Sequence, residues 1–323
     1  MVRRPGRSAA VIEVEGLTRW FGGRCVVGDL TLRVQKGQMI GLLGRNGAGK
    51  TTVLRLLAGV LMPDAGIVRI DGHDLARAPR LARRRLGYLP EGAPLYGHVT
   101  VQALLLYLAR LRGLRRAQLV RRYEETVLAL DIEPVLARPV ASLTRGQRCR
   151  VGIAQAILHD PPVLLLDEPG DGLDPGEQAS VRALLRSLSR DRAIVVATQR
   201  LDDMVPQCTR LGLLSRGRLV LDDTPGGLRA RSRYRGAVSF SAVAAGPARA
   251  ALGLLPEVDT IEVDPCSGRV TVLSKPGREL LPKVQALLAN YGVQPSELTL
   301  EPGRLEDVFN SLTEADAALE GEA

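Results

Sequence analysis

The feature that most constrains this chain is a glycine-rich segment from Gly44 to Thr51. Its residues, GRNGAGKT, match the phosphate-binding pattern G-x-x-x-x-G-K-[ST] at every fixed position. The apolar run 39–43 before it predicts a buried strand, and residues 51–58 after it predict a helix. Glycines let successive backbone N–H groups converge on an anion at the positive end of such a helix. The segment therefore predicts a phosphate loop and a nucleoside triphosphate site.

Within this loop, two side chains have distinct predicted tasks. Lys50 is expected to reach the terminal phosphates, and the Thr51 hydroxyl is expected to ligate Mg²⁺. The alternative is a glycine-rich turn that only resembles the motif, and the strand and helix on either side argue against it. The predicted nucleotide-binding residues of the loop are Gly44, Arg45, Asn46, Gly47, Ala48, Gly49, Lys50, Thr51 and Thr52.

A pair of acids follows a second buried strand. Asp167 and Glu168 come directly after the aliphatic run 163–166. The carboxyl end of a parallel strand is where such sheets bind ligands, so both acids are expected beside the phosphate loop. Asp167 can then hold the magnesium ion, and Glu168 can polarise an attacking water. An exposed turn is the alternative, but two acids after four aliphatic residues are rarely only a turn.

Two adjacent aromatic residues, Trp20 and Phe21, lie in a predicted turn between alternating strands at 11–15 and 31–35. Only 3% of the chain is aromatic. Such a pair just upstream of a phosphate loop therefore indicates a stacking platform for a base. Core packing is the alternative, about as plausible for Trp20 and less so for Phe21.

The length of 323 residues predicts about two domains. Strands and helices alternate over 11–225, with a helical insert at about 92–150, and a composition change near 222–227 precedes a small α+β domain at 226–313. Residues 1–10 are expected to be disordered, and 314–323 are expected to form a flexible tail. No apolar stretch approaches the ~20 residues that a spanning helix needs, and the basic start lacks the apolar segment of a signal peptide.

The net charge of +9 is carried mostly by arginine. A positive charge of this size is compatible with binding to nucleic acid, with binding to an anionic membrane surface, or with arginine-rich coding that has no functional meaning. The charge alone does not distinguish these explanations. Six of the arginines are expected at exposed positions of the helical insert, where a solvated face is the simplest interpretation: Arg110, Arg112, Arg115, Arg116, Arg121 and Arg122.

With its segments in this order, the chain resembles the ATP-binding cassette (ABC) family, specifically the single-cassette ATP-binding subunits of exporters. The resemblance covers residues ~11–225, and residues 305–313 resemble the close of the domain appended in that subgroup. It implies a P-loop NTPase cassette: a RecA-like mixed sheet, an antiparallel subdomain and a helical insert. A small C-terminal α+β domain would follow.

The resemblance also implies roles for individual residues. Phe21 would stack on adenine, and Glu91 would join Thr51 and Asp167 near Mg²⁺. Asp174 lies in the loop 171–174 that crosses the dimer interface in this family. The signature motif, which acts on the nucleotide of the other subunit, would be Leu143, Thr144, Arg145, Gly146 and Gln147.

Four residues in three motifs depart from the family pattern. Glu91 stands where glutamine is usual, and Thr144 and Arg145 replace serine and glycine of the signature. Gln199 stands where a histidine normally contacts the γ-phosphate. Glutamine can donate a hydrogen bond but carries neither a proton nor a charge to the site. Losing one transition-state donor typically costs roughly 10²–10³ in rate. Among the catalytic residues Lys50, Glu168 and Gln199, the last therefore puts the rate of hydrolysis in question.

The function implied is an ATP-binding subunit of an ABC transporter that binds MgATP at a dimer interface. It would act at the cytoplasmic face of the cell membrane and drive export through a separate permease. A second hypothesis is an ATP-binding module with little hydrolysis, a regulator or the degenerate half of a heterodimer. A nucleic-acid ATPase is suggested only by the charge; the chain lacks a second cassette and a long coiled coil, so no nucleic-acid partner is expected.

Overall fold

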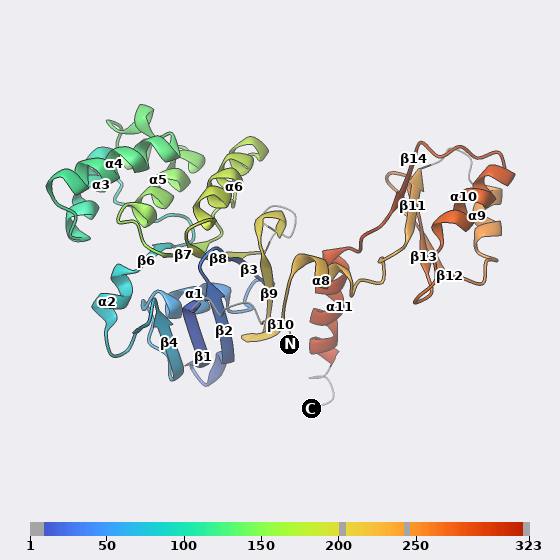
Figure 1. The fold of residues 1–323 in the computed structure, drawn as a ribbon, viewed down its shortest axis with the longest axis horizontal. Helices are drawn as coiled ribbons and strands as arrows, with labels where there is room; N and C mark the ends of the chain where they lie inside the picture. Colours follow the sequence, from blue (N-terminus) through green and yellow to red (C-terminus); the bar gives the residue numbers. More distant parts are fainter. Residues whose placement is uncertain (1–9, 200–204, 242–245, 319–323) are drawn as a thin grey trace, which may run out of the picture. The chain divides into compact units, whose positions relative to one another are not determined.

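The computed structural model describes residues 10–199, 205–241 and 246–318, and the chain divides into two compact units after Asp223 (Figure 1). The division lies inside the composition change at 222–227. The predicted disorder of 1–10 falls, apart from Ala10, outside the described residues.

A six-stranded sheet forms the centre of the first unit, in the order β10-β9-β3-β8-β7-β6. All neighbouring strands are parallel except β9 and β10, which form an antiparallel hairpin. Every residue of β3, β7 and β8 is buried, which explains why these strands are continuous apolar runs in the sequence. The strands span Met39–Leu43 (β3), Leu86–Leu89 (β6), Val163–Asp167 (β7), Ala193–Thr198 (β8), Arg210–Ser215 (β9) and Arg218–Asp223 (β10).

A second, antiparallel sheet has the order β2-β1-β4-β5. Its strands are Ala10–Phe21 (β1), Arg24–Gln35 (β2), Ala65–Ile70 (β4) and His73–Asp74 (β5). One aliphatic core joins both sheets to α1 (Lys50–Leu57). The mixed sheet, the antiparallel subdomain and the helical insert confirm the predicted fold class.

The predicted turn between the first two strands is shorter than expected. β1 runs on through Trp20 and Phe21, so the turn consists of Gly22 and Gly23 alone. Their φ angles of 54° and 82° lie in the region that favours glycine. The two aromatic side chains therefore stand at the end of a strand.

The helical insert comprises α3 (Val101–Leu111), α4 (Arg116–Leu130) and α5 (Arg145–Ile157), with short 3₁₀ turns at 133–135 and 140–142. The chain turns between α3 and α4 at Gly113, whose φ is 88°. The short helix α2 (Pro79–Arg84) precedes the insert, and α6 (Pro175–Ser189) follows β7.

Two of the six arginines that were expected to be exposed are partly buried. The Arg112 guanidinium donates to the Arg83 carbonyl. The Arg122 side chain is only 14% exposed, and it pairs with Glu125 at 2.6 Å and Asp160 at 3.3 Å. The contacts with Arg83 and Asp160 join segments far apart in the chain, so helical periodicity alone could not reveal them. The other four arginines are exposed.

The second unit is built on a four-stranded antiparallel sheet with the order β12-β13-β11-β14. Its core packs Phe240 and Val272 of the sheet against Leu252, Val284 and Leu288 of two helices. The strands are Val238–Ser241 (β11), Val258–Val263 (β12), Val270–Ser274 (β13) and Glu297–Leu300 (β14). The helices are Pro225–Arg229 (α8), Gly246–Leu252 (α9), Leu281–Asn290 (α10) and Leu305–Ala318 (α11).

The tail prediction is wrong in part, because α11 continues to Ala318 and so includes residues 314–318. Alanine and glutamate are common in this stretch and favour helix, and Glu306 and Asp307 in the first turn favour the helix dipole. The remainder of the predicted tail, 319–323, lies outside the described residues. Within the part of the chain that the structure describes, no helix is both long and apolar enough to cross a membrane.

His159, in the turn after α5, gives the first unit a testable pH dependence. Burial and the nearby charges of Arg112 and Arg122 lower the pKa of His159 to about 4, although the bond from its Nε2 to the Leu86 carbonyl opposes them. The unfolded chain therefore takes up this proton first, near the usual pKa of about 6.5. Stability that is complete above pH 6.5 should fall as the pH drops toward 4.

We expect His159→Gln to remove this part of the pH dependence. A tenfold difference in proton affinity is worth about 1.4 kcal/mol, so the variant should lose on the order of 3 kcal/mol less stability than the wild type between pH 7 and 4. Urea denaturation followed by the fluorescence of Trp20, the single tryptophan and part of β1, measures the first unit. An equal loss in both proteins would contradict the assignment.

Candidate nucleotide site

The phosphate loop lies between β3 and α1, as predicted, and it lines a hollow. The same hollow is lined by Glu91, Glu168 and Gln199. These three residues follow β6, β7 and β8, so the carboxyl ends of neighbouring parallel strands bring together residues that are distant in the sequence. Gln199 therefore stands at the phosphate loop.

At two positions of the loop, neighbouring backbone atoms come so close that only glycine fits. A Cβ at Gly44 would lie 2.6 Å from the Leu214 carbonyl oxygen. Gly49 has a φ of 102°, and a Cβ there would lie 2.7 Å from the Val26 carbonyl oxygen. Any larger residue would push the loop away from β2 and β9, so the loop's curvature depends on both positions.

Lys50 is the buried cation of the loop, with a side chain that is 7% exposed. Its Nζ donates to the Gly44 carbonyl at 2.7 Å and to the Arg45 carbonyl at 3.3 Å. Burial lowers the pKa of Lys50, while the charges of Glu168, Asp167 and Glu91 raise it. The ammonium thus sits between the loop and a group of acids.

Asp167, the last residue of β7, is 1% exposed. Neither of its carboxylate oxygens has a hydrogen-bond donor among the described residues within ordinary bonding geometry. Burial raises the pKa of Asp167; the neighbouring Thr51 hydroxyl and the charges of Lys50 and Arg55 lower it, and Glu91 raises it. A buried carboxylate without donors is well suited to a hard cation.

Glu168 adopts a φ of 46°, which is uncommon for a residue with a side chain. Its N–H donates to the Ala197 carbonyl of β8 at 3.0 Å, so the strained backbone is tied to the neighbouring strand. Burial raises the pKa of Glu168, Asp167 and Asp171 add to the rise, and Lys50 and Thr198 oppose it. A raised pKa makes the carboxylate more basic, which suits a group that polarises water.

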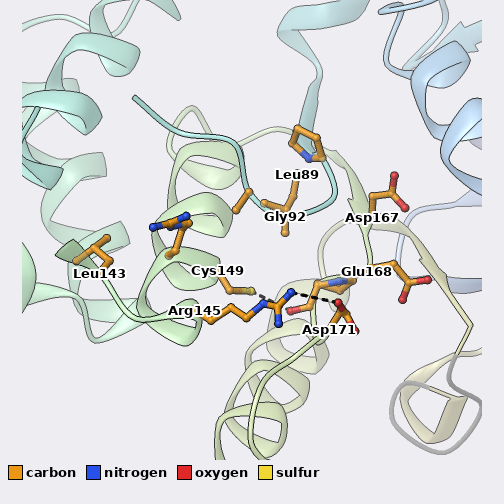
Figure 2. A pocket seen from close by; sticks show the side chains of 12 residues that line it. Leu89, Gly92, Leu143, Arg145, Cys149, Asp167, Glu168 and Asp171 are labelled. Carbon is orange, nitrogen blue, oxygen red and sulfur yellow. Dashed lines mark hydrogen bonds and ion pairs between the residues drawn. The ribbon is translucent and has the colours of Figure 1, made fainter. Parts of the chain in front are cut away.

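A second hollow adjoins Glu168 on the side away from the phosphate loop (Figure 2). It lies between residues 89–93, the start of α5 and residues 167–171, and Leu143, Arg145, Asp167 and Glu168 are among the residues that line it. Leu143 and Arg145 of the signature segment line this hollow, and no residue of 143–147 lines the phosphate hollow of its own chain. Glu168 is common to both.

Thr144 caps α5, as its position in the sequence predicts. Its Oγ1 accepts from the Gln147 N–H at 3.2 Å, and the Gln147 Oε1 accepts from the Thr144 N–H at 3.1 Å. A Cβ at Gly146 would lie 1.9 Å from the Glu177 Oε1, so the start of α5 packs closely against the start of α6. Asp174 caps α6 by the same reciprocal pattern with Glu177.

Arg145 extends from the first position of α5 across to Asp171, as Figure 2 shows. Its Nη2 lies 3.7 Å from an Asp171 carboxylate oxygen. The guanidinium occupies the space beside Gly172, where a Cβ would lie 2.1 Å from Nη1. Both partners are largely exposed, so the pair contributes no more than about 1 kcal/mol.

The aromatic pair does not pack into the core, so that alternative is wrong. The Trp20 side chain is 50% exposed and Phe21 is 42% exposed. The Arg19 guanidinium lies 4.7 Å from the centre of the Phe21 ring and is held by Asp64 at 2.8 Å. Sequence reasoning missed Arg19 and Asp64, because their contact joins strand β1 to a turn 45 residues later.

Comparison with known proteins agrees with this geometry. A model of the family described as ABC transporter matches residues 27–171. The chain is 36% identical over 220 residues to the Nod factor export ATP-binding protein I of Paraburkholderia xenovorans, a match that covers 68% of this chain and 72% of that protein. It is 32% identical over 310 residues to the daunorubicin resistance ATP-binding protein DrrA3 of Streptomyces coeruleorubidus, with 94% and 96% covered.

A solved structure described as the ATP binding subunit of an ABC transporter aligns with a TM-score of 0.64 and 30% identity. The alignment covers 68% of this chain and 92% of that chain. The similarity to DrrA3 extends beyond the first unit, because it spans most of both sequences.

Lys50→Ala should abolish tight ATP binding, because Lys50 is the buried cation of the phosphate loop. We expect affinity measured by titration calorimetry to fall at least about a hundredfold, which corresponds to about 2.7 kcal/mol. Lys36→Ala removes the same charge from an exposed turn and is the matched control. Equal affinity in both variants would show that the loop is not the binding site.

Proposed function

The chain belongs to the ABC transporter family of ATP-binding proteins, which are ATPases, and on that basis we propose how it works. It binds MgATP between two ATP-binding subunits and couples ATP binding and hydrolysis to export through a separate membrane permease. The observation that carries the proposal is the convergence of the phosphate loop, Asp167, Glu168 and Gln199 at one edge of the sheet.

The residues present fit a magnesium ion. Asp167 offers a buried carboxylate, and the Thr51 hydroxyl lies close enough to lower its pKa. Glu91 lines the adjoining hollow. Among the described residues, no group of three or more His, Cys, Asp or Glu side chains could hold a metal ion by itself, so phosphate oxygens and water would complete the coordination. When bound, Mg²⁺ neutralises part of the phosphate charge.

The side chains of the phosphate hollow have complementary roles in hydrolysis. Lys50 and the loop N–H groups hold the phosphates, and Phe21 supports the adenine. Glu168, with its raised pKa, accepts a hydrogen bond from the attacking water and orients it toward the γ-phosphate. Gln199 donates one hydrogen bond from the opposite side of the hollow. Most of the catalysis is therefore positioning and charge stabilisation.

A second subunit completes the site. The phosphate hollow is open to solvent, and the signature segment 143–147 of the same chain lines a different hollow. In the dimer, Leu143, Thr144, Arg145, Gly146 and Gln147 of one chain cover the nucleotide of the other, and Asp174 lies near the interface. ATP then stabilises the association, which weakens after hydrolysis.

Binding to the proposed permease would locate the protein at the membrane. We place the chain peripherally at the cytoplasmic face, bound to a permease and to a second cassette that is identical or related. The names of two relatives, for Nod factor export and daunorubicin resistance, support an export role. Gln199 favours a second candidate, a cassette that binds ATP but turns over slowly.

Glu168→Gln should trap an ATP-bound dimer, because it removes the carboxylate that orients water and leaves the binding surfaces intact. We expect sedimentation velocity to show a monomer without nucleotide and a dimer with saturating MgATP. Glu124→Gln, which alters an exposed acid of α4 that lines neither hollow, is the control for charge. A Glu168→Gln protein that stays monomeric with bound ATP would contradict the dimer mechanism.

Gln199→His should raise kcat by about tenfold or more, with little change in ATP affinity. Histidine adds a donor where charge develops during phosphoryl transfer and leaves the loop and Glu168 unaltered. Steady-state ATPase assays with and without the permease measure the effect. Fast hydrolysis by the unmodified protein, with no gain in the variant, would mean that glutamine suffices.

A further inference from the structure

The aromatic ring at the end of β1, that of Phe21, is supported by a cation from its own strand. The Arg19 guanidinium lies over the ring, 4.7 Å from its centre. Phe21 is nevertheless 42% exposed, so part of the ring surface remains accessible to solvent. The ring is therefore held by the chain on one face and is open to a ligand elsewhere.

Arg19 is itself fixed by Asp64, the residue directly before β4. The Arg19 Nη1 donates to the Asp64 Oδ1 at 2.8 Å, and the Trp20 N–H donates to the Asp64 Oδ2 at 2.7 Å. The Asp64 N–H donates to the Thr18 carbonyl at 2.9 Å. The Arg19 side chain is only 25% exposed, so the ion pair is partly shielded from water. One carboxylate thus fixes both the guanidinium over the ring and the backbone next to Phe21.

The hairpin end that carries Phe21 adjoins the phosphate hollow. Phe21 pairs with Arg24 across the hairpin, and Val26, two residues further along β2, lines the hollow. Two residues of a strand span roughly 7 Å. A Cβ at Gly49 would lie 2.7 Å from the Val26 carbonyl oxygen, so the hairpin packs directly on the phosphate loop. Phe21 lies beside the hollow and does not line it, which suits a base that is joined to the phosphates through a ribose.

We propose that Arg19 and Asp64 are positioning residues for the base of ATP. Arg19, held by Asp64, fixes the Phe21 ring from one face, and adenine stacks on the other face. This inference rests on the proposed role of Phe21 as the support for adenine. A cation over one face of a ring draws the π electrons toward itself and lowers their density on the opposite face. That opposite face then repels the π electrons of the purine less.

Holding the ring before ATP arrives also lowers the entropic cost of stacking. A free phenylalanine side chain at a strand end changes rotamer, and it loses that freedom when a base binds. Because Arg19 already restrains the ring, less freedom is lost on binding. An exposed contact between a cation and a ring changes a binding equilibrium by about two- to fivefold. The effect of Arg19 and Asp64 should therefore be modest in size and specific to ligands that carry a base.

Arg19→Gln combined with Asp64→Asn removes both charges together and leaves the net charge unchanged. We expect the affinity for MgATP, measured by titration calorimetry, to fall about three- to fivefold. The affinity for magnesium tripolyphosphate, which has no base, should stay the same. Arg33→Gln combined with Glu15→Gln is the matched control, because it removes an exposed ion pair of 3.1 Å from the same sheet. Equal losses for both ligands, or no loss for MgATP, would overturn the proposal.

A double-mutant cycle tests whether the effect acts through the ring. Phe21→Ala alone should lower the affinity for MgATP at least about fivefold, because a stacked base is lost. Adding the Arg19 and Asp64 changes to Phe21→Ala should then cause no further loss, since no ring remains to be positioned. The same fold-loss with and without the ring would show that the ion pair acts on the fold or on the local charge, and would refute the positioning role.

The variants also separate this inference from the proposed function. If Phe21→Ala left the affinity for MgATP unchanged while Lys50→Ala abolished tight binding, the support for adenine and this inference would fail together, and the phosphate site would stand. A loss of affinity in Phe21→Ala, with none in the Arg19 and Asp64 double variant, would refute only this inference.

Discussion

The burial of Lys50 and Asp167 at the carboxyl edge of the parallel sheet is the constraint on which the site depends. Each charge is costly to remove from water, and each is only partly compensated within the chain. Lys50 bonds to two carbonyls of its own loop, and Asp167 has no donor among the described residues. Such an arrangement is suited to binding a polyanion and a cation at the same time. The glycines at 44 and 49 and the strained backbone of Glu168 maintain it.

The parts of the fold that follow from local chemistry could be predicted from the sequence. The loop, the buried strands, the Thr144 cap and the acids after β7 each depend on a few neighbouring residues. What could not be predicted depends on distant contacts. The pairing of Arg19 with Asp64 needs the register of strand β1, and that of Arg145 with Asp171 needs the packing of α5 on α6. Helical periodicity predicts an exposed Arg122, yet its guanidinium forms an ion pair with Asp160.

Two hollows meet at Glu168 in one subunit. The phosphate-binding loop lines the first, and Leu143 and Arg145 of the signature segment line the second. In the proposed dimer, the signature segment of one chain completes the phosphate hollow of the other. Sharing the site between subunits makes ATP part of the interface, so the energy of nucleotide binding can drive association.

Association of two differently defective chains tests the shared site most directly. One chain carries Lys50→Ala and cannot hold phosphate, and the other carries Gly146→Asp, which places a carboxylate beside Glu177 at the signature segment. With Glu168→Gln in both to prevent turnover, neither should dimerise alone. Mixed with MgATP, they should form a heterodimer with one tightly bound nucleotide, measured by pull-down of tagged chains and nucleotide counting. No heterodimer, despite ATP binding by the Gly146→Asp chain, would contradict a site completed by the partner.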